Sequence, residues 1–414
     1  MAVIKPFRAV RPIVELAVKV AALPYDVMNS KEAKEMVKGN PYSFLHVDKP
    51  EIDMEDGVNI YDKSVYEGAR KYLDRLIEEG TLIMEDKPKL YIYRQIMKGR
   101  AQTGIVACAS IDDYLNNKIK KHENTIAAKE TDRINHVTYC DAQTGPIFLT
   151  YRSVDEINEI VSLQTRSTPV YDFKSEDGVS QIVWVIEEDE VIDRLTTLFL
   201  GVENMYIADG HHRANSAVRV GLKKRKAMTT FTGEEEFNYF LTVIFPDKDL
   251  YIMDYNRVVS DLNGLSQEEY LQKISESFDV REFSEPGSCK PDSKYTYGMF
   301  MDGKWYILRA KEGTYSLIDP VAGLDVSILQ DNLLGPILGI KDPRTDDRID
   351  FVGGIRGLHG LEKRVKEGMK LAFALYPPTI KELMDIADIG EIMPPKSTWF
   401  EPKLRSGLFI HKIG

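Results

Sequence analysis

The sequence has few cysteines and no long apolar run. Its 414 residues include only three cysteines, Cys108, Cys140 and Cys289, which are odd in number and far apart. They indicate neither a disulfide framework nor a C-x-x-C metal site, and they are typical of a reducing compartment. No run approaches the length of a membrane span, and Met1 to Pro12 has no apolar core segment. The sequence therefore predicts a cytoplasmic protein without membrane association.

A surplus of positive charge is also absent. Lys and Arg number 54 against 65 Asp and Glu, which gives a formal net charge of -11. Proteins that bind nucleic acids generally hold the phosphate backbone with surplus basic residues, so no nucleic-acid partner is expected. Repeats and low-complexity tracts are absent as well. With 43% hydrophobic residues, the chain is long enough for two or three domains with sizeable cores.

What the chain does contain is an uneven alternation of strand-like and helix-like segments. Residues 90–108 predict a hairpin, and residues 42–47 predict a strand. This uneven order favours an α+β fold, with a mixed sheet and helices, over a regular doubly wound sheet. A capped helix that begins near Ser266 indicates a boundary close to residue 260. We therefore expect an N-terminal α+β domain over 1–260 and a C-terminal α+β region over 261–414.

The most informative stretch is a predicted strand, turn and helix around residue 210. The apolar run Met205–Ala208 ends before Gly210, and small or apolar residues then recur at helical spacing. Gly210 allows a strained turn and a close approach of ligand to backbone, and the first N–H groups of a helix attract anions. His211, His212 and Arg213 add side-chain donors, and a guanidinium can grip a phosphate in bidentate fashion. The stretch therefore predicts a phosphate-binding site.

Other interpretations of this stretch remain open. Asp-Gly before a helix is ordinary turn chemistry, and a histidine pair can be an exposed helix start. A metal site through both His211 and His212 is disfavoured, because neighbouring residues on a helix face different directions. Asp209 is instead the candidate metal ligand, since magnesium prefers carboxylate oxygens plus waters.

A second candidate segment, residues 118–133, is dense in ionisable side chains. Within it, His122, Glu123 and Thr125 place a base, a donor and a hydroxyl in four residues, a combination suited to proton transfer. The alternative is a solvated helix on which Lys and Glu residues form weak pairs. Both interpretations stay open at this point.

The tail contains a third candidate, which follows the Pro394-Pro395 pair. The prolines fix the backbone, and the polar side chains after them can bind a phosphate or a carboxylate: Lys396, Ser397, Thr398 and Lys403. The loop has no Gly-x-x-x-x-Gly lead and so is not a Walker loop. Its alternative role is a rigid C-terminal arm packed by Trp399 and Phe400.

Several of these segments together resemble one family over nearly the whole chain. Their ordered set strongly resembles the bacterial and archaeal family called domain of unknown function 1015: Lys5-Pro6-Phe7, Pro24-Tyr25-Asp26-Val27, Asn40 to Leu45, Lys121-His122-Glu123, Ala208 to Arg213 and Met393 to Lys403. The Asp-Gly-His-His-Arg element also resembles the second box of ParB-like domains. That superfamily includes ParB, sulfiredoxin and free serine kinases, and it binds nucleotide phosphates at this turn and helix.

The second resemblance implies a ParB/sulfiredoxin-like nucleotide-binding core with a C-terminal α/β region. Similarity to the kinases implies that Asp209, His211, His212 and Arg213 surround the phosphates of ATP or ADP, with magnesium nearby. Sulfiredoxin chemistry needs a reactive cysteine in this motif, where this chain has histidines. ParB also carries a helix-turn-helix DNA-binding domain, which is not identified in this sequence.

Together these features predict a nucleotide-dependent phosphotransferase that acts on a small hydroxylated metabolite, with free serine as the specific candidate. Gly210 and the donors after it would hold the phosphates, and Asp209 would hold magnesium. Glu123 is the first candidate for the base that takes the hydroxyl proton, beside His122, and Asp26 is the second. The alternatives are a phosphatase of a small phosphorylated metabolite and a non-catalytic nucleotide-binding regulatory protein.

Overall fold

The computed structural model describes residues 2–55, 57–284 and 289–414, and its chain forms two compact units. The first unit comprises Met1–Lys121, Thr125–Leu250 and Pro402–Gly414, and the second comprises His122–Asn124 and Tyr251–Glu401. The C-terminal segment thus belongs to the first unit, together with the N-terminal half of the chain. That residues 1–260 and 261–414 form separate domains stays a prediction.

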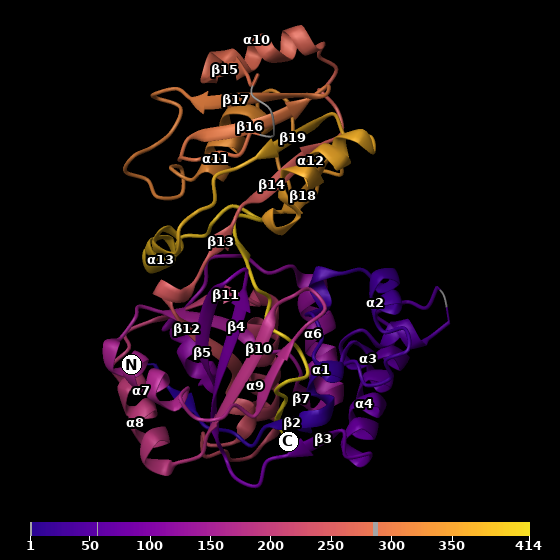
Figure 1. Cartoon of the computed structure of the whole chain (residues 1–414), viewed down its shortest axis with the longest axis vertical. Coiled ribbons are helices and arrows are strands. Elements are labelled where there is room, and N and C mark those ends of the chain that lie inside the picture. The colour runs from indigo at the N-terminus through magenta and orange to yellow at the C-terminus, as the bar shows by residue number, and fades with distance from the viewer. Residues whose placement is uncertain (1, 56, 285–288) are drawn as a thin grey trace. The chain divides into compact units, whose positions relative to one another are not determined.

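The first unit is built on a nine-stranded mixed sheet, counted over the described residues (Figure 1). Its strand order is β6-β11-β8-β12-β5-β4-β10-β9, with β1 paired to β5. The strands are β1 (Ile4–Lys5), β4 (Leu90–Met97), β5 (Arg100–Ser110), β6 (Ile119–Lys120), β8 (Ile147–Tyr151), β9 (Tyr171–Lys174), β10 (Ser180–Ile186), β11 (Met205–Asp209) and β12 (Tyr239–Pro246). The β6–β11 and β8–β12 pairs are parallel and the others antiparallel, which confirms the predicted α+β class.

Helices flank this sheet and complete its core. Figure 1 shows α7 and α8 side by side at one flank of the sheet and α4 and α6 at the other. The helices are α1 (Ala17–Val20), α2 (Ser30–Met36), α3 (Leu45–Asp48), α4 (Lys63–Glu78), α5 (Ile111–Leu115), α6 (Ala127–Cys140), α7 (Asp155–Gln164), α8 (Asp189–Leu200) and α9 (His211–Ala227). Ala214, Ala217 and Val218 of α9 pack into the main core with strand residues such as Ile207 and Leu149. Among the described residues, no helix is both long and apolar enough to cross a membrane.

The predicted hairpin and one predicted strand had different outcomes. The hairpin at residues 90–108 is confirmed as β4 and β5, which pair antiparallel from Tyr91–Val106 to Met97–Arg100. The strand predicted at residues 42–47 is wrong, because the chain there is turn and helix, with α3 beginning at Leu45. Every residue from Ser43 to Asp48 is buried. A segment buried on all sides has no alternation by which a strand can be told from a helix.

The second unit contains a six-stranded sheet in which every adjacent pair is antiparallel. Its order is β15-β17-β16-β19-β14-β18. The strands are β14 (Tyr255–Val259), β15 (Phe278–Glu282), β16 (Thr296–Met301), β17 (Lys304–Ala310), β18 (Ile349–Gly353) and β19 (Leu371–Ala374), and the helices are α10 (Gln267–Ser277), α11 (Asp325–Leu329), α12 (Gly357–Lys366) and α13 (Ile380–Asp388). β16 and β17 turn at Asp302 and Gly303, both at positive φ, as expected for a two-residue hairpin.

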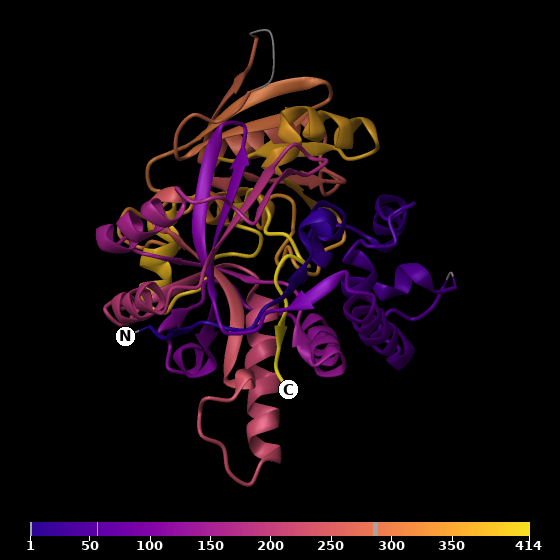
Figure 2. The ribbon, with the colours of Figure 1, turned by 60° about the horizontal axis from the view of Figure 1, so that its bottom comes forward.

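The close packing of α9 leads to a prediction about stability. Figure 2 shows α9 extending away from the sheet, with the following loop returning toward β12. A Cβ added at Gly221 would lie 2.4 Å from the backbone oxygen of Phe237. Because that carbonyl cannot rotate away, we expect Gly221→Ala to lower the free energy of unfolding by about 2 kcal/mol or more, measured by urea denaturation.

Gly68→Ala is the matched control, because Gly68 also lies inside a helix, α4. Its added Cβ would lie 2.9 Å from the terminal Cε of Met54 and, at an ordinary contact distance of 3.7 Å, from Cβ of Pro50. A flexible side-chain end can move aside, and alanine is favoured over glycine in a helix by about 1 kcal/mol. The two substitutions should therefore differ clearly, and equal effects would contradict the packing argument.

Candidate functional site

Gly210 forms the junction between β11 and α9 in the first unit. Its φ of 94° and ψ of 32° are left-handed, and no side chain caps the helix that begins at His211. An added Cβ would lie 3.1 Å from Nε of Arg213, so a side chain here would press on that guanidinium. The backbone conformation thus favours glycine, and a Cβ would fit only if the guanidinium moved by a few tenths of an ångström. The predicted strand, turn and helix are confirmed as β11, Gly210 and α9.

Asp209, at the end of β11, is held by two cationic side chains. Nη2 of Arg213 donates to one carboxylate oxygen at 2.8 Å, and Nζ of Lys403 lies 3.4 Å from the other. Nη1 of Arg213 donates to the backbone oxygen of Pro146 at 2.6 Å. Burial alone would raise the pKa of Asp209, but the charges of Lys403 and Arg213 outweigh it and lower the pKa to about 2. Asp209 is therefore ionised and fixed in place.

Nothing in the sequence indicates that Lys403 lies near this turn. It lies 194 positions after Asp209, in the C-terminal segment that returns to the first unit. A hydrogen bond to its backbone holds this segment in place: Nε2 of Gln95 donates to the backbone oxygen of Lys403 at 2.9 Å. The sequence indicated that Lys403 can bind a carboxylate, but only the fold shows that this carboxylate belongs to Asp209.

The ion pairs of Asp209 predict a pH-dependent contribution to stability. Its pKa falls from an ordinary value of 3.8 to about 2, so the folded state binds fewer protons than the unfolded state between these values. The contribution, about 2 kcal/mol, is therefore full above pH 4 and is lost as the pH falls toward 2. Urea denaturation of Asp209→Asn should show this deficit at pH 7 and a smaller one at pH 3. Glu203→Gln, which removes an exposed carboxylate, is the control; a deficit that does not depend on pH would contradict the assignment.

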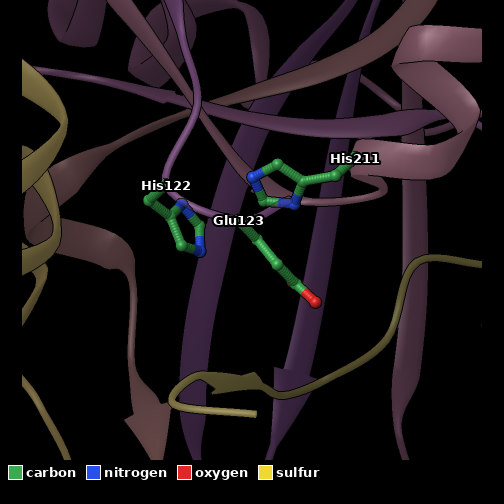
Figure 3. Close-up of side chains that lie close together, drawn as sticks. All are labelled: His122, Glu123 and His211. Atoms are coloured by element: carbon green, nitrogen blue, oxygen red, sulfur yellow. The ribbon is translucent and has the colours of Figure 1, made fainter. Parts of the chain in front are cut away.

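The two histidines of the turn have different surroundings. His211 is buried, and Figure 3 shows its imidazole at the start of α9. Nε2 of His212 accepts a hydrogen bond from the backbone N–H of Ile126, 3.0 Å away, at the N-cap of α6. This contact requires an unprotonated Nε2. His212 therefore links the N-termini of α6 and α9, where both helix dipoles present their positive ends.

A polar network lies next to this junction. Nδ2 of Asn215 donates to Oγ1 of Thr125 at 3.1 Å and to Oε1 of Glu130 at 2.7 Å, and the Thr125 hydroxyl also donates to Glu130. The sequence singled out Thr125 as part of an ionisable segment. It did not identify Glu130 or Asn215 as members of a site, since only the packing of α6 on α9 brings them together.

Asp26, the second candidate for the base, lies in the same unit and acts on Arg213 through its charge. Burial lowers the pKa of Arg213, but the carboxylates of Asp209 and Asp26 more than reverse this effect. The neighbouring Tyr25 lines a cavity of about 30 Å³ together with Arg213 and Arg133. The guanidinium of Arg133 lies 3.9 Å from the centroid of the Tyr25 ring. The fold thus brings the segment containing Asp26 to the turn.

The remaining predicted residues belong to the second unit. Figure 3 draws the side chains of His122 and Glu123, the first candidate for the base. Nε2 of His122 lies 3.4 Å from Oγ1 of Thr398, and the backbone oxygen of His122 accepts from the N–H of Met393 at 2.9 Å. The structure therefore joins the second and third candidate segments, although 276 positions separate His122 from Thr398. Their roles in catalysis stay predictions.

Ser397 and Lys396 serve partly to shape this loop. The Ser397 hydroxyl donates to the backbone oxygen of Pro394 at 2.6 Å, and Lys396 has a left-handed φ of 57°. Nζ of Lys396 lies 5.8 Å from the centroid of the Tyr255 ring. Both the predicted anion contacts and the alternative of a rigid arm are compatible with these bonds.

The residues around Gly210 suit a phosphate better than they suit magnesium. The uncapped start of α9 and the left-handed glycine leave backbone approachable, as phosphate binding requires. A magnesium ion at Asp209 would have to compete with Arg213 and Lys403, which already balance the carboxylate. Magnesium at Asp209 and a phosphate at this turn therefore both stay predictions, and the cations around Asp209 favour the phosphate.

Comparisons with known proteins identify similar sequences and structures. A family model described as "Protein of unknown function (DUF1015)" matches residues 4–327. The search of curated proteins found no match. A conserved hypothetical protein from Pyrococcus furiosus is 13% identical, with a TM-score of 0.37 over 74% of this chain and 95% of that one. A free serine kinase variant in complex with AMP is 14% identical, with a TM-score of 0.39, and the match covers 74% of this chain and 92% of the kinase. C-terminally truncated SbnI from Staphylococcus aureus is 11% identical, with a TM-score of 0.38, and the match covers 74% of this chain and 87% of SbnI.

Proposed function

The chain belongs to the family described as protein of unknown function (DUF1015), and from its own site we propose that it is a nucleotide-dependent phosphotransferase. The acceptor is a small hydroxylated metabolite, with free serine as the specific candidate. The nucleotide is ATP or ADP, with its phosphates at the turn between β11 and α9. Magnesium, when bound, would offset part of the negative charge of these phosphates.

The observation that carries the proposal is the turn at Gly210. Its left-handed glycine is only partly buried and precedes the uncapped start of a 17-residue helix, and Arg213 and Lys403 bring two positive charges to the same place. Asp209 fixes both cations, so their positions are set before any ligand arrives. Fixed donors are what phosphoryl transfer requires, because catalysis there consists mostly of positioning and charge stabilisation.

Transfer also requires a base for the acceptor hydroxyl. The hydroxyl oxygen forms a bond to the terminal phosphorus of the nucleotide, the bond from that phosphorus to the bridging oxygen breaks, and a carboxylate takes the hydroxyl proton. Glu123 remains a candidate for this carboxylate. The charge of Asp26 at Arg213 supports Asp26 for the role, since both residues lie in the first unit. If Asp26 is the base, Asp26→Asn should lose turnover and still bind the nucleotide. If Glu123 is the base, Glu123→Gln should show this result instead.

Calorimetric titration with ATP, ADP and CTP in the presence of magnesium tests the nucleotide site. The nucleotide that binds is then supplied with label in its terminal phosphate, together with serine, and the products are separated. Label in phosphoserine would establish the kinase. Release of inorganic phosphate from phosphoserine without nucleotide would instead establish a phosphatase, and saturable binding without chemistry across a metabolite panel would indicate a regulatory protein. If no nucleotide binds, the phosphotransferase is excluded.

A further inference from the structure

Arg257 is a buried cation in the sheet of the second unit. It lies on β14, between β18 and β19, and its exposed fraction is 3%. Its guanidinium donates to the backbone oxygens of Tyr255 and, at 3.4 Å, of Pro395. Among the residues that the structure describes, no carboxylate forms an ion pair with it. Its contacts are thus neutral carbonyls and the face of the Phe351 ring, 5.4 Å away.

Other well-buried arginines of this chain have the partner that Arg257 lacks. Arg133 pairs with Asp132, Arg213 with Asp209, and Arg405 with Asp177. A buried guanidinium without a counter-charge is unfavourable, since carbonyl dipoles replace only part of its hydration. Burial lowers the pKa of Arg257 to about 10, so the side chain still carries its charge at neutral pH. Arg257 therefore carries a buried charge that no ion pair among the described residues balances.

A small cavity of about 10 Å³ gives that charge a place. Arg257 and Ser397 line it, as do two acids, Asp325 and Glu382. Glu382 already pairs with Lys294 and caps α13. Asp325 accepts from the backbone N–H of Tyr295 at 2.6 Å. Burial raises the pKa of Asp325 to about 7, which weakens it as a counter-charge.

A second cation, Lys396, directly follows Pro395, whose backbone oxygen accepts from Arg257. Tyr255 is one of the residues that line the cavity, and Nζ of Lys396 lies 5.8 Å from the centroid of the Tyr255 ring. The Ser397 hydroxyl, which also lines the cavity, can both donate and accept. Arginine, lysine and serine together form a set that suits an oxyanion. The cavity itself has room for one oxygen-sized atom, so most of the ligand would lie outside it.

We propose that Arg257, with Lys396 and Ser397, binds the phosphate or carboxylate group of a small molecule at this cavity. The site belongs to the second unit and goes beyond the phosphotransfer proposed for the turn at Gly210. The bound oxyanion supplies the missing counter-charge of Arg257. A phosphate and a carboxylate would both bind through negatively charged oxygens, and the experiment below distinguishes the two.

The indole N–H signals of the full chain provide the test. Trp399 lies two residues after Ser397, its ring centroid is 5.0 Å from that of Tyr255, and its Nε1 donates to Glu401 at 2.8 Å. Inorganic phosphate and malonate are titrated separately, with chloride replaced at constant ionic strength. We expect one of them to move the Trp399 signal, assigned with Trp399→Phe, in a saturable manner. The signal of Trp305, on β17 and bonded to Glu362, should stay in place.

Three variants decide the origin of this shift. Arg257→Met should abolish it, and Arg257→Lys, which keeps the charge but not the forked geometry, should weaken the binding about tenfold. Arg213 belongs to the first unit, so Arg213→Ala should leave the shift of the Trp399 signal unchanged. The proposal fails if neither anion moves the Trp399 signal, or if the shift persists in Arg257→Met. Should that variant not fold, unchanged affinity in Arg257→Lys overturns the proposal just as well.

Discussion

Replacement of Gly210 by alanine should weaken nucleotide binding about a hundredfold, equivalent to about 2.7 kcal/mol. Two effects contribute. The φ of 94° is unfavourable for any residue with a Cβ, and that Cβ would lie 3.1 to 3.2 Å from three atoms of the Arg213 guanidinium. Since the same guanidinium holds Asp209, we expect the pressure to displace both side chains. Calorimetric titration with the nucleotide that binds the wild type measures the loss.

Gly233→Ala separates backbone strain from crowding. Gly233 lies in the same unit, its φ is 95°, and an added Cβ would have nothing within 4 Å. It therefore carries the same backbone penalty as Gly210→Ala without contact to the turn. We expect Gly233→Ala to lose stability and keep its nucleotide affinity. Equal affinities in the two variants would show that the turn at Gly210 does not hold the phosphates.

Asp325→Asn should stabilise the protein at alkaline pH. Burial raises the pKa of Asp325 from 3.8 to about 7, so the folded state binds more protons than the unfolded state between these values. The wild type therefore loses stability as the pH rises from 4 to 7, by about 4 kcal/mol in total. Asparagine keeps the carbonyl oxygen that accepts from Tyr295, and it never has to ionise. The variant should avoid the loss.

Urea denaturation at pH 4 and pH 8 checks this expectation. The two proteins should be nearly equal at pH 4, and the variant should be the more stable at pH 8. Asp331→Asn is the control, because Asp331 belongs to the same unit but is exposed. A variant that is less stable than the wild type at pH 8 would show that Asp325 is ionised and needed as a charge.

Local sequence signals identified the turn and the sheet hairpins because their causes are local. Apolar residues followed by Asp209-Gly210 and a helical repeat define β11 and α9 without knowledge of the rest of the chain. Asp302-Gly303, at the turn between β16 and β17, is a local signal of the same kind. The segment at residues 42–47 gave the wrong element because its residues are buried on all sides, and burial depends on distant parts of the chain.

The partners of the predicted site residues could not be found in this way. Lys403 reaches Asp209 across 194 positions, and Thr398 reaches His122 across 276. No periodicity or spacing records such pairs, since they follow from the path of the C-terminal segment. Arg257 gave no sequence signal at all, because a single arginine in a strand looks like an exposed residue until its burial is known.

The sequence by itself determined the α+β class and the turn at Gly210, since these follow from residue type and local spacing. It also predicted phosphate as the ligand of that turn. Only the tertiary structure decided that Asp209 is held by Arg213 and Lys403 and that His212 accepts from the N-cap residue of α6. It alone showed that Arg257 is buried and has no ion pair with a carboxylate of the described residues. The physical reason is that charge and burial act through space. A side chain's pKa and its free donors depend on which distant residues the fold places beside it.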